Sequence, residues 1–125
     1  MMKKISKDHA MVGIEYSNGI IETIYIHENV HPQNLFSFLK EKDFEQMINI
    51  LREGDIKEII NSNIYKYIDD PNENPEDCES VRFINEIETL KFFKNSICRY
   101  FYLMKWEGEE WFYIDRNQNL NWRKL

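Results

Sequence analysis

The sequence predicts one α+β domain over residues 1–125: an antiparallel sheet built from N-terminal and C-terminal hairpins, with about three helices packed on one face. Two patterns predict this class. Runs of alternating or β-branched apolar residues stand near both ends of the chain, which is typical of strands. Between them, apolar residues recur every three or four positions, which is typical of helices. With 125 residues, of which 42% are apolar, the chain is long enough to bury a core without metal or disulfide support.

The first hairpin is predicted around Asn18 and Gly19, which separate two apolar runs. Asn-Gly is typical of two-residue type I′ turns, because both central positions need positive φ. This turn pairs Tyr16 with Ile21 and places one set of side chains on the core face: Val12, Ile14, Tyr16, Ile21, Thr23 and Tyr25. By the same alternation, His27 falls on the core side at the end of the second strand.

Two helices are predicted in the next segment. Pro32 suits the first turn of a helix, and the apolar stripe behind it is Leu35, Phe36 and Leu39. Asp43 and Gln46 have the spacing of a capping box, and Gly54 suits the C′ position that ends the second helix. The apolar positions between them are Phe44, Met47, Ile48 and Leu51.

The middle of the chain predicts shorter elements. We expect a turn of helix over residues 56–60, a strand near Ile64 to Ile68, and another strand from Val81 to Ile84. A third helix is predicted from Asn85, which has Glu88 three residues later, to about Asn95. Its expected buried positions are Ile87, Leu90 and Phe93 or Lys94.

The C-terminal hairpin is predicted to turn at Glu107 and Gly108. One face then carries Phe101, Leu103, Phe112 and Ile114, which we assign to the core, and the other carries Tyr100, Tyr102, Met104, Trp106, Trp111 and Tyr113. Tyr and Trp are enriched in binding hot spots. If that face is exposed, it predicts an aromatic binding site at Tyr100, Tyr102, Trp106, Trp111 and Tyr113. The alternative is that a helix covers it and makes a three-layer core.

The charge balance excludes some partners. Asp and Glu outnumber Lys and Arg by 22 to 16, for a formal net charge of −6. Without a basic run, we expect no direct binding to nucleic acid. No apolar run approaches the length of a membrane span, and no apolar core follows the first lysines. We therefore expect no signal peptide, no membrane contact and a cytoplasmic protein.

Six acidic residues gather in the proline-containing stretch of residues 69–80: Asp69, Asp70, Glu73, Glu76, Asp77 and Glu79. The prolines and asparagines among them predict a loop. Such a loop is usually a solvated surface. The alternative is a binding surface that imitates the charge pattern of nucleic acid and occupies a basic cleft of a partner protein. The spacing does not fit an EF-hand calcium loop.

His27 and His31 stand four residues apart, a spacing that binds metal when both histidines lie on one helix. Pro32 and the preceding strand place them in a loop instead, where this spacing determines no common face. The candidates for a third ligand have no diagnostic spacing: His9, Glu28 and Cys78. We therefore predict no metal site and no cofactor, and we expect His27 to hydrogen-bond the loop backbone.

The two cysteines predict neither a zinc framework nor a catalytic nucleophile. Cys98 precedes the last hairpin and is expected to be a small buried apolar residue. Cys78 lies among acidic neighbours, which disfavour the thiolate. A disulfide between the two stays open. Because no catalytic constellation is found elsewhere, we expect no enzyme activity.

Residues 24–32 read Ile-Tyr-Ile-His-Glu-Asn-Val-His-Pro and resemble the I-Y-C-H-W-D-G-Y-P motif of a family of small, uncharacterised phage and prophage proteins. The matching positions are Ile24, Tyr25, His27 and Pro32. Residues 51–56 match an L-x-x-G-D-[IL] segment of the family, and its aromatic hairpin is matched by Tyr100, Tyr102, Met104, Trp111 and Tyr113. The chain departs from the motif at Glu28, Asn29, Val30 and His31. Asn29 stands where the motif has aspartate, and it cannot act as a general base or charged ligand.

The resemblance implies a phage or mobile-element origin, a small α+β fold and structural roles for Tyr25, His27 and Pro32. Proteins of this origin and size often inhibit host machinery. We therefore predict a non-catalytic counter-defence inhibitor, anti-CRISPR-like or of another kind. It would bind a host protein in the bacterial cytoplasm through its acidic and aromatic surfaces. The alternatives are a small-molecule or nucleotide-binding protein with an aromatic pocket and His27 at its rim, and an acidic toxin-immunity protein. The oligomeric state stays open, with a dimer as one option.

Overall fold

The computed structural model describes residues 8–66 and 79–125. Its helices are α1 (Pro32–Lys40), α2 (Phe44–Arg52) and α3 (Glu86–Asn95). Its strands are β1 (Ala10–Glu15), β2 (Ile21–Ile26), β3 (Glu58–Ile60), β4 (Asn63–Tyr65), β5 (Val81–Phe83), β6 (Tyr100–Met104), β7 (Trp111–Asp115) and β8 (Arg123–Lys124). Within the described ranges, none of the helices has the length and apolarity needed to cross a membrane.

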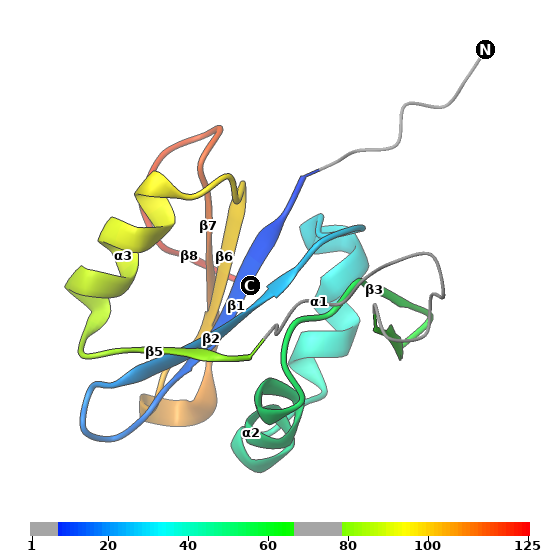
Figure 1. Cartoon of the computed structure of the whole chain (residues 1–125), viewed down its shortest axis with the longest axis horizontal. Helices are drawn as coiled ribbons and strands as arrows, with labels where there is room; N and C mark the ends of the chain where they lie inside the picture. The colour runs from blue at the N-terminus through cyan, green and yellow to red at the C-terminus, as the bar shows by residue number, and fades with distance from the viewer. Residues whose placement is uncertain (1–7, 67–78) are drawn as a thin grey trace.

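Six strands form the main sheet, in the order β5-β2-β1-β6-β7-β8, and β3 pairs with β4 in a separate small sheet. The helices lie on both sides of the main sheet, with α1 and α2 on one face and α3 on the other (Figure 1). The predicted α+β class is confirmed. The prediction that all helices pack on one face is wrong.

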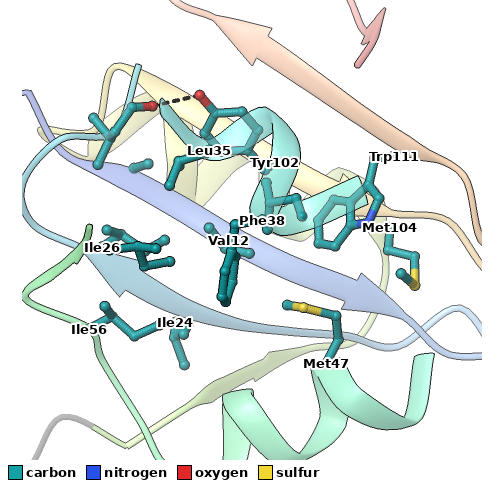
Figure 2. Close-up of a cluster of buried hydrophobic side chains, with 14 of the residues drawn as sticks. Val12, Ile24, Ile26, Leu35, Phe38, Met47, Ile56, Tyr102, Met104 and Trp111 are labelled. Carbon is teal, nitrogen blue, oxygen red and sulfur yellow. Dashed lines mark hydrogen bonds between the residues drawn. The ribbon is translucent and has the colours of Figure 1, made fainter. Parts of the chain in front are cut away.

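The reason lies in the central strands. Every residue of β6 is buried, and so are the first five residues of β1. A strand that is apolar on both sides needs cover on both sides, so the sheet cannot leave one face to solvent. Leu35, Phe38 and Met47 cover one face (Figure 2), and Phe93 covers the other.

The sheet is antiparallel except where β1 meets β6, which run parallel. The predicted antiparallel sheet is therefore corrected at this pair. Strand β5 is antiparallel to β2, which is antiparallel to β1, so β5 runs parallel to β1. The helix α3 then returns the chain, and β6 starts in the same direction as β5 and β1.

The first hairpin has a three-residue turn instead of the predicted two-residue turn. The Tyr16 N–H donates to the Ile20 carbonyl at 2.8 Å, and the Gly19 N–H donates to the Tyr16 carbonyl at 2.9 Å. Gly19 has a φ of 89°, the left-handed conformation that ends such a turn. The predicted register is therefore wrong by one residue, and Val12 lies opposite Ile24.

A shift of one residue turns the side chains of β2 to the opposite faces. Ile24 and Ile26 join Val12 and Ile14 in the core under α1 and α2. The residues predicted for that core face lie on the α3 side instead: Ile21, Thr23 and Tyr25. His27, which was predicted on the same core face, therefore also lies on the α3 side.

The helices begin where the sequence predicts. The Gln46 N–H donates to Asp43 Oδ1 at 2.8 Å and the Asp43 N–H donates to Gln46 Oε1 at 3.0 Å, which confirms the capping box. Asn85 Oδ1 accepts from the Glu88 N–H at 2.9 Å at the start of α3. Gly54 follows α2 with a φ of 86°, as predicted for a C′ residue.

Two predicted core residues on the helices are exposed. Phe36 is 45% exposed and Ile87 is 65% exposed. The buried residues of α1 are Leu35, Phe38 and Leu39, and those of α3 are Thr89 and Phe93. In a short helix, the apolar spacing alone does not determine which neighbouring residue faces the sheet. The packing of the helix on the sheet determines this.

Residues 56–60, predicted as a turn of helix, include strand β3 instead. It pairs with β4 through a two-residue turn at Asn61 and Ser62. The strand predicted from Ile64 is confirmed over β4, and residues 67 and 68 lie outside the described residues. The strand predicted from Val81 is confirmed as β5.

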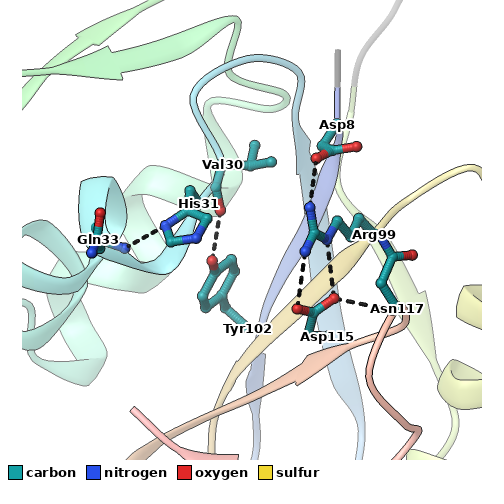
Figure 3. A network of polar contacts seen from close by, with 8 residues as sticks. All are labelled: Asp8, Val30, His31, Gln33, Arg99, Tyr102, Asp115 and Asn117. Atoms are coloured by element: carbon teal, nitrogen blue, oxygen red, sulfur yellow. Dashed lines mark hydrogen bonds and ion pairs between the residues drawn. The ribbon is translucent and has the colours of Figure 1, made fainter. Parts of the chain in front are cut away.

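Tyr102 ties the centre of the sheet to the start of α1. Its side chain is fully buried, and its hydroxyl donates to the Val30 carbonyl at 2.6 Å (Figure 3). Burial raises the pKa of the Tyr102 phenol well above its ordinary value, so the hydroxyl keeps its proton. This bond holds the loop between β2 and α1 over β6.

Tyr102→Phe should lower the free energy of unfolding by about 1–3 kcal/mol, because the Val30 carbonyl stays buried without its donor. Urea unfolding measures the change. Tyr113→Phe is the matched control, since that ring stacks on Tyr102 at 5.9 Å but is only half-buried. Equal losses in the two variants would contradict a special role for the Tyr102 hydroxyl.

Candidate functional site

The aromatic face of the C-terminal hairpin is core and not a surface. The predicted register is confirmed, with Phe101 opposite Ile114. On the other face, four side chains are at most 5% exposed: Tyr100, Tyr102, Met104 and Trp111. Tyr113 is half-buried, and Trp106 is exposed at the rim, where it packs against Phe44. The predicted aromatic binding site is therefore corrected to the covered alternative at Tyr100, Tyr102 and Trp111. Of its two other residues, Trp106 is exposed and Tyr113 is partly exposed.

The acidic surface lies mostly outside the described residues. This holds for Cys78 and for five of the six acidic positions: Asp69, Asp70, Glu73, Glu76 and Asp77. Glu79 is described and exposed. The acidic binding surface therefore stays a prediction.

His27 and His31 lie on different faces of the sheet. His31 is the N-cap of α1, where its Nδ1 accepts from the Gln33 N–H at 3.1 Å (Figure 3). The His31 ring packs edge-to-face on Tyr100. Pro32 is the first residue of that helix. The His27 ring instead lies near Tyr25, on the α3 side. The two histidines therefore form no shared site.

His27 lines a pocket between the ends of β1 and β2 and the C-terminal end of α3, which we call the histidine pocket. Its volume is about 410 Å³. The lining residues are His9, Tyr25, His27, Phe92, Asn95, Ser96, Ile97 and Cys98. Apolar side chains and two imidazoles therefore share one concave surface.

The two imidazoles meet because β1 and β2 pair. Ala10 lies opposite Ile26, so the next position outward places His9 beside His27. Their ring centroids are 5.4 Å apart in an edge-to-face arrangement. Among the described residues, His9 Nδ1 is buried without a hydrogen-bond partner.

The side chain of Asp55 lies next to that of His27. Its Oδ1 accepts from the Tyr25 N–H at 2.8 Å, and its Oδ2 is 3.8 Å from His27 Nε2. The backbone of His27 is also bonded to the segment that carries Asp55, because the His27 N–H donates to the Ile56 carbonyl at 3.1 Å. Protonated His27 would form an ion pair with Asp55, and the backbone bonds hold both residues in place for it.

Arg99 holds the His9 segment against β6 and β7. Its backbone N–H donates to the His9 carbonyl at 2.9 Å, and its guanidinium donates to Asp8 Oδ2 at 3.1 Å. The same guanidinium binds both carboxylate oxygens of Asp115 at 3.0 and 3.3 Å (Figure 3). A bidentate pair of this kind is geometrically restrictive. The edge of the histidine pocket is therefore anchored by charge-assisted bonds.

Two groups in the pocket lining, the Cys98 thiol and the Tyr25 phenol, keep their protons near pH 7. Burial raises the pKa of the Cys98 thiol to about 11, against smaller opposing effects of the Ser96 hydroxyl and Arg116. Burial, with Cys98 and Asp55 nearby, raises the pKa of Tyr25 to about 12. The fully buried Cys98 confirms the predicted small apolar residue. A protonated thiol is a poor nucleophile, so Cys98 is not activated for nucleophilic attack near pH 7.

The described residues contain no group of three or more His, Cys, Asp or Glu side chains arranged to hold a metal ion. Two features of the candidate site were not predicted from the sequence: the position of Asp55 beside His27, and the contact between His9 and His27. The correct hairpin register would have placed His9 opposite His27 directly.

Comparison with known proteins gives no relatives. No protein-family model, curated protein or solved structure matches the chain. The resemblance to the phage protein family therefore stays a prediction.

The neutral groups of the pocket predict a loss of stability at alkaline pH. In the unfolded chain, Cys98 and Tyr25 ionise near their ordinary pKa values of 9.0 and 10.0, whereas in the fold they ionise at about 11 and 12. The free energy of unfolding should therefore be at its full value below pH 9 and fall as pH rises through 9 to 12. Urea unfolding between about pH 8 and pH 11 measures this decline.

The double variant Cys98→Ala, Tyr25→Phe serves as the comparison, because both ionisable groups are removed. Its stability should decline less over the same pH range than that of the wild type. An equal decline would show that neither group contributes.

Proposed function

We propose that the protein binds a small, mostly apolar ligand in the histidine pocket. The observation that carries this proposal is the convergence of two imidazoles on a largely apolar hollow. Ligand sites are typically apolar cavities of about 300–1,000 Å³ with a few placed polar groups. The volume of about 410 Å³ lies within that range.

The lining indicates the shape of the ligand. Phe92 and Ile97 are 41% and 81% exposed, although both are large apolar residues at the pocket. A ring-sized apolar group would cover them and remove that area from water. A hydrogen-bonding group on the ligand would face His9, whose Nδ1 has no partner among the described residues.

The protonation of two lining residues supports an uncharged ligand. Tyr25 and Cys98 keep their protons near pH 7, because burial raises the pKa of each group. A permanently charged ligand would therefore meet few compensating charges deep in the pocket. We infer a planar or aliphatic molecule with one polar end.

The counter-defence inhibitor predicted from the sequence has less support than ligand binding. Most of its aromatic surface is core, and most of its acidic surface lies outside the described residues. It stays a prediction that rests on the family resemblance.

Thermal denaturation with a library of small aromatic molecules, including phenol, indole and the nucleobases, tests the proposal. A ligand present at 100 times its Kd adds about 2.7 kcal/mol of stability, which raises the Tm by several degrees. Ile97→Lys should abolish the shift, because it places a charge at the apolar rim. His9→Ala should weaken it by removing the polar partner.

Ile84→Lys is the matched control for Ile97→Lys. Ile84 is 72% exposed and does not line the histidine pocket, so this variant should respond to ligand as the wild type does. The proposal is wrong if no compound shifts the Tm, or if Ile97→Lys and Ile84→Lys respond alike to a compound that does.

A further inference from the structure

A second hollow lies on the α1 side of the molecule, between the loop after β2, helix α1 and the turn of the β3–β4 hairpin. Its volume is about 350 Å³. Six polar side chains line it: Asn29, Gln33, Asn34, Ser37, Asn61 and Ser62. We call it the amide groove. It shares no residue with the histidine pocket.

Residues other than glycine that have positive φ are concentrated at this groove. Among the described residues, four that are not glycine have positive φ, and three of them line the groove: Asn29 at 56°, Asn61 at 49° and Ser62 at 65°. The fourth is Glu109, with a φ of 50°, in the C-terminal hairpin. Strained residues of this kind cluster at functional sites.

Ser62 is the most informative of the three. Asn61 and Ser62 form the two-residue turn between β3 and β4, and both have positive φ, as a type I′ turn requires. Asn-Gly is the favoured pair in such a turn, because glycine adopts positive φ without steric cost. Serine at this place costs conformational energy and adds a hydroxyl to the groove.

Asn29 is oriented by its neighbour. Its Nδ2 donates to Glu58 Oε2 at 2.7 Å. A carboxylate only accepts hydrogen bonds, so the amide nitrogen is on the Glu58 side and the amide oxygen is available as an acceptor. This bond fixes the orientation of the Asn29 amide in the lining, beside the exposed amides of Gln33, Asn34 and Asn61.

The lining decides the chemistry of the ligand. None of the described residues that line the groove carries a formal charge, so a phosphate or carboxylate would find no cation there. Amide and hydroxyl side chains each donate and accept, which matches groups that do both. Phe38 and Ile59 form a buried apolar floor, and Ile60 is 40% exposed beside it.

We propose that the amide groove binds a neutral carbohydrate, one hexose or N-acetylhexosamine unit. The sugar hydroxyls would exchange hydrogen bonds with the amides and Ser62, and a C–H face of the ring would pack on Ile60. This proposal is independent of ligand binding in the histidine pocket.

NMR titration of ¹⁵N-labelled protein with glucose, galactose, mannose and N-acetylglucosamine, each in turn, tests the proposal. At least one sugar should shift the side-chain amide signals of the groove, those of Asn29, Gln33, Asn34 and Asn61, and leave the backbone signals of His9 and His27 unchanged. No shift with any of the four sugars would overturn it. Shifts confined to residues outside the groove would also overturn it.

Ser62→Gly separates binding from folding. Glycine suits a φ of 65°, so the Tm should stay the same or rise. Affinity for the sugar should fall about three- to tenfold, because one hydrogen bond is lost. Glu109→Gly is the matched control: it relieves the same backbone conformation outside the groove and should leave affinity unchanged. Unchanged affinity in Ser62→Gly would contradict the proposal.

Filling the groove provides a second variant. Ser37→Trp puts a large ring into the groove from the exposed side of α1 and should abolish the amide shifts. Asn49→Trp makes the same change on the exposed side of α2, outside the groove, and should bind as the wild type does. Equal binding by both variants would contradict the assigned site.

Discussion

The turn after Tyr16 determines how the two N-terminal strands meet, and the rest of the molecule depends on that register. Because Gly19 takes a left-handed conformation and closes a three-residue turn, Val12 lies opposite Ile24 and Ala10 opposite Ile26. In the same register, His9 and His27 lie beside each other at the position that follows the last strand pair, Ala10 and Ile26. One conformational constraint therefore sets both the sheet core and the geometry of the histidine pocket.

Burial on both faces follows from this register. Ile24 and Ile26 pack with Val12 and Ile14 under α1 and α2, while Ile21 and Met11 pack under α3. Glu22 is left in a nearly inaccessible position, where Arg82 Nε bonds it at 2.9 Å and the Tyr16 hydroxyl donates to it at 3.0 Å. A buried carboxylate needs such partners, so Arg82 couples the edge strand β5 to its neighbour β2.

Local signals predicted most of the elements, although β3 was predicted as helix and β8 was missed. Long-range geometry did not follow from these signals. Asp43 with Gln46, and Asn85 with Glu88, marked helix starts because a capping side chain binds backbone within the same turn. The Asn-Gly pair predicted a hairpin but not the length of its loop. Because the predicted register was wrong by one residue, it did not place His9 beside His27. Asp55 reaches His27 only through the fold, so no spacing could reveal it. The aromatic residues around Tyr102 show that composition cannot distinguish a binding face from a covered one.

A crystal structure of the protein soaked with small aromatic fragments tests the central claim most directly, that the hairpin register creates a ligand site beside His9 and His27. The account predicts a fragment seated between Tyr25 and Phe92 with its polar group toward His9. It would be contradicted by fragments bound only elsewhere on the surface, or by a hairpin register in which His9 and His27 are not neighbours.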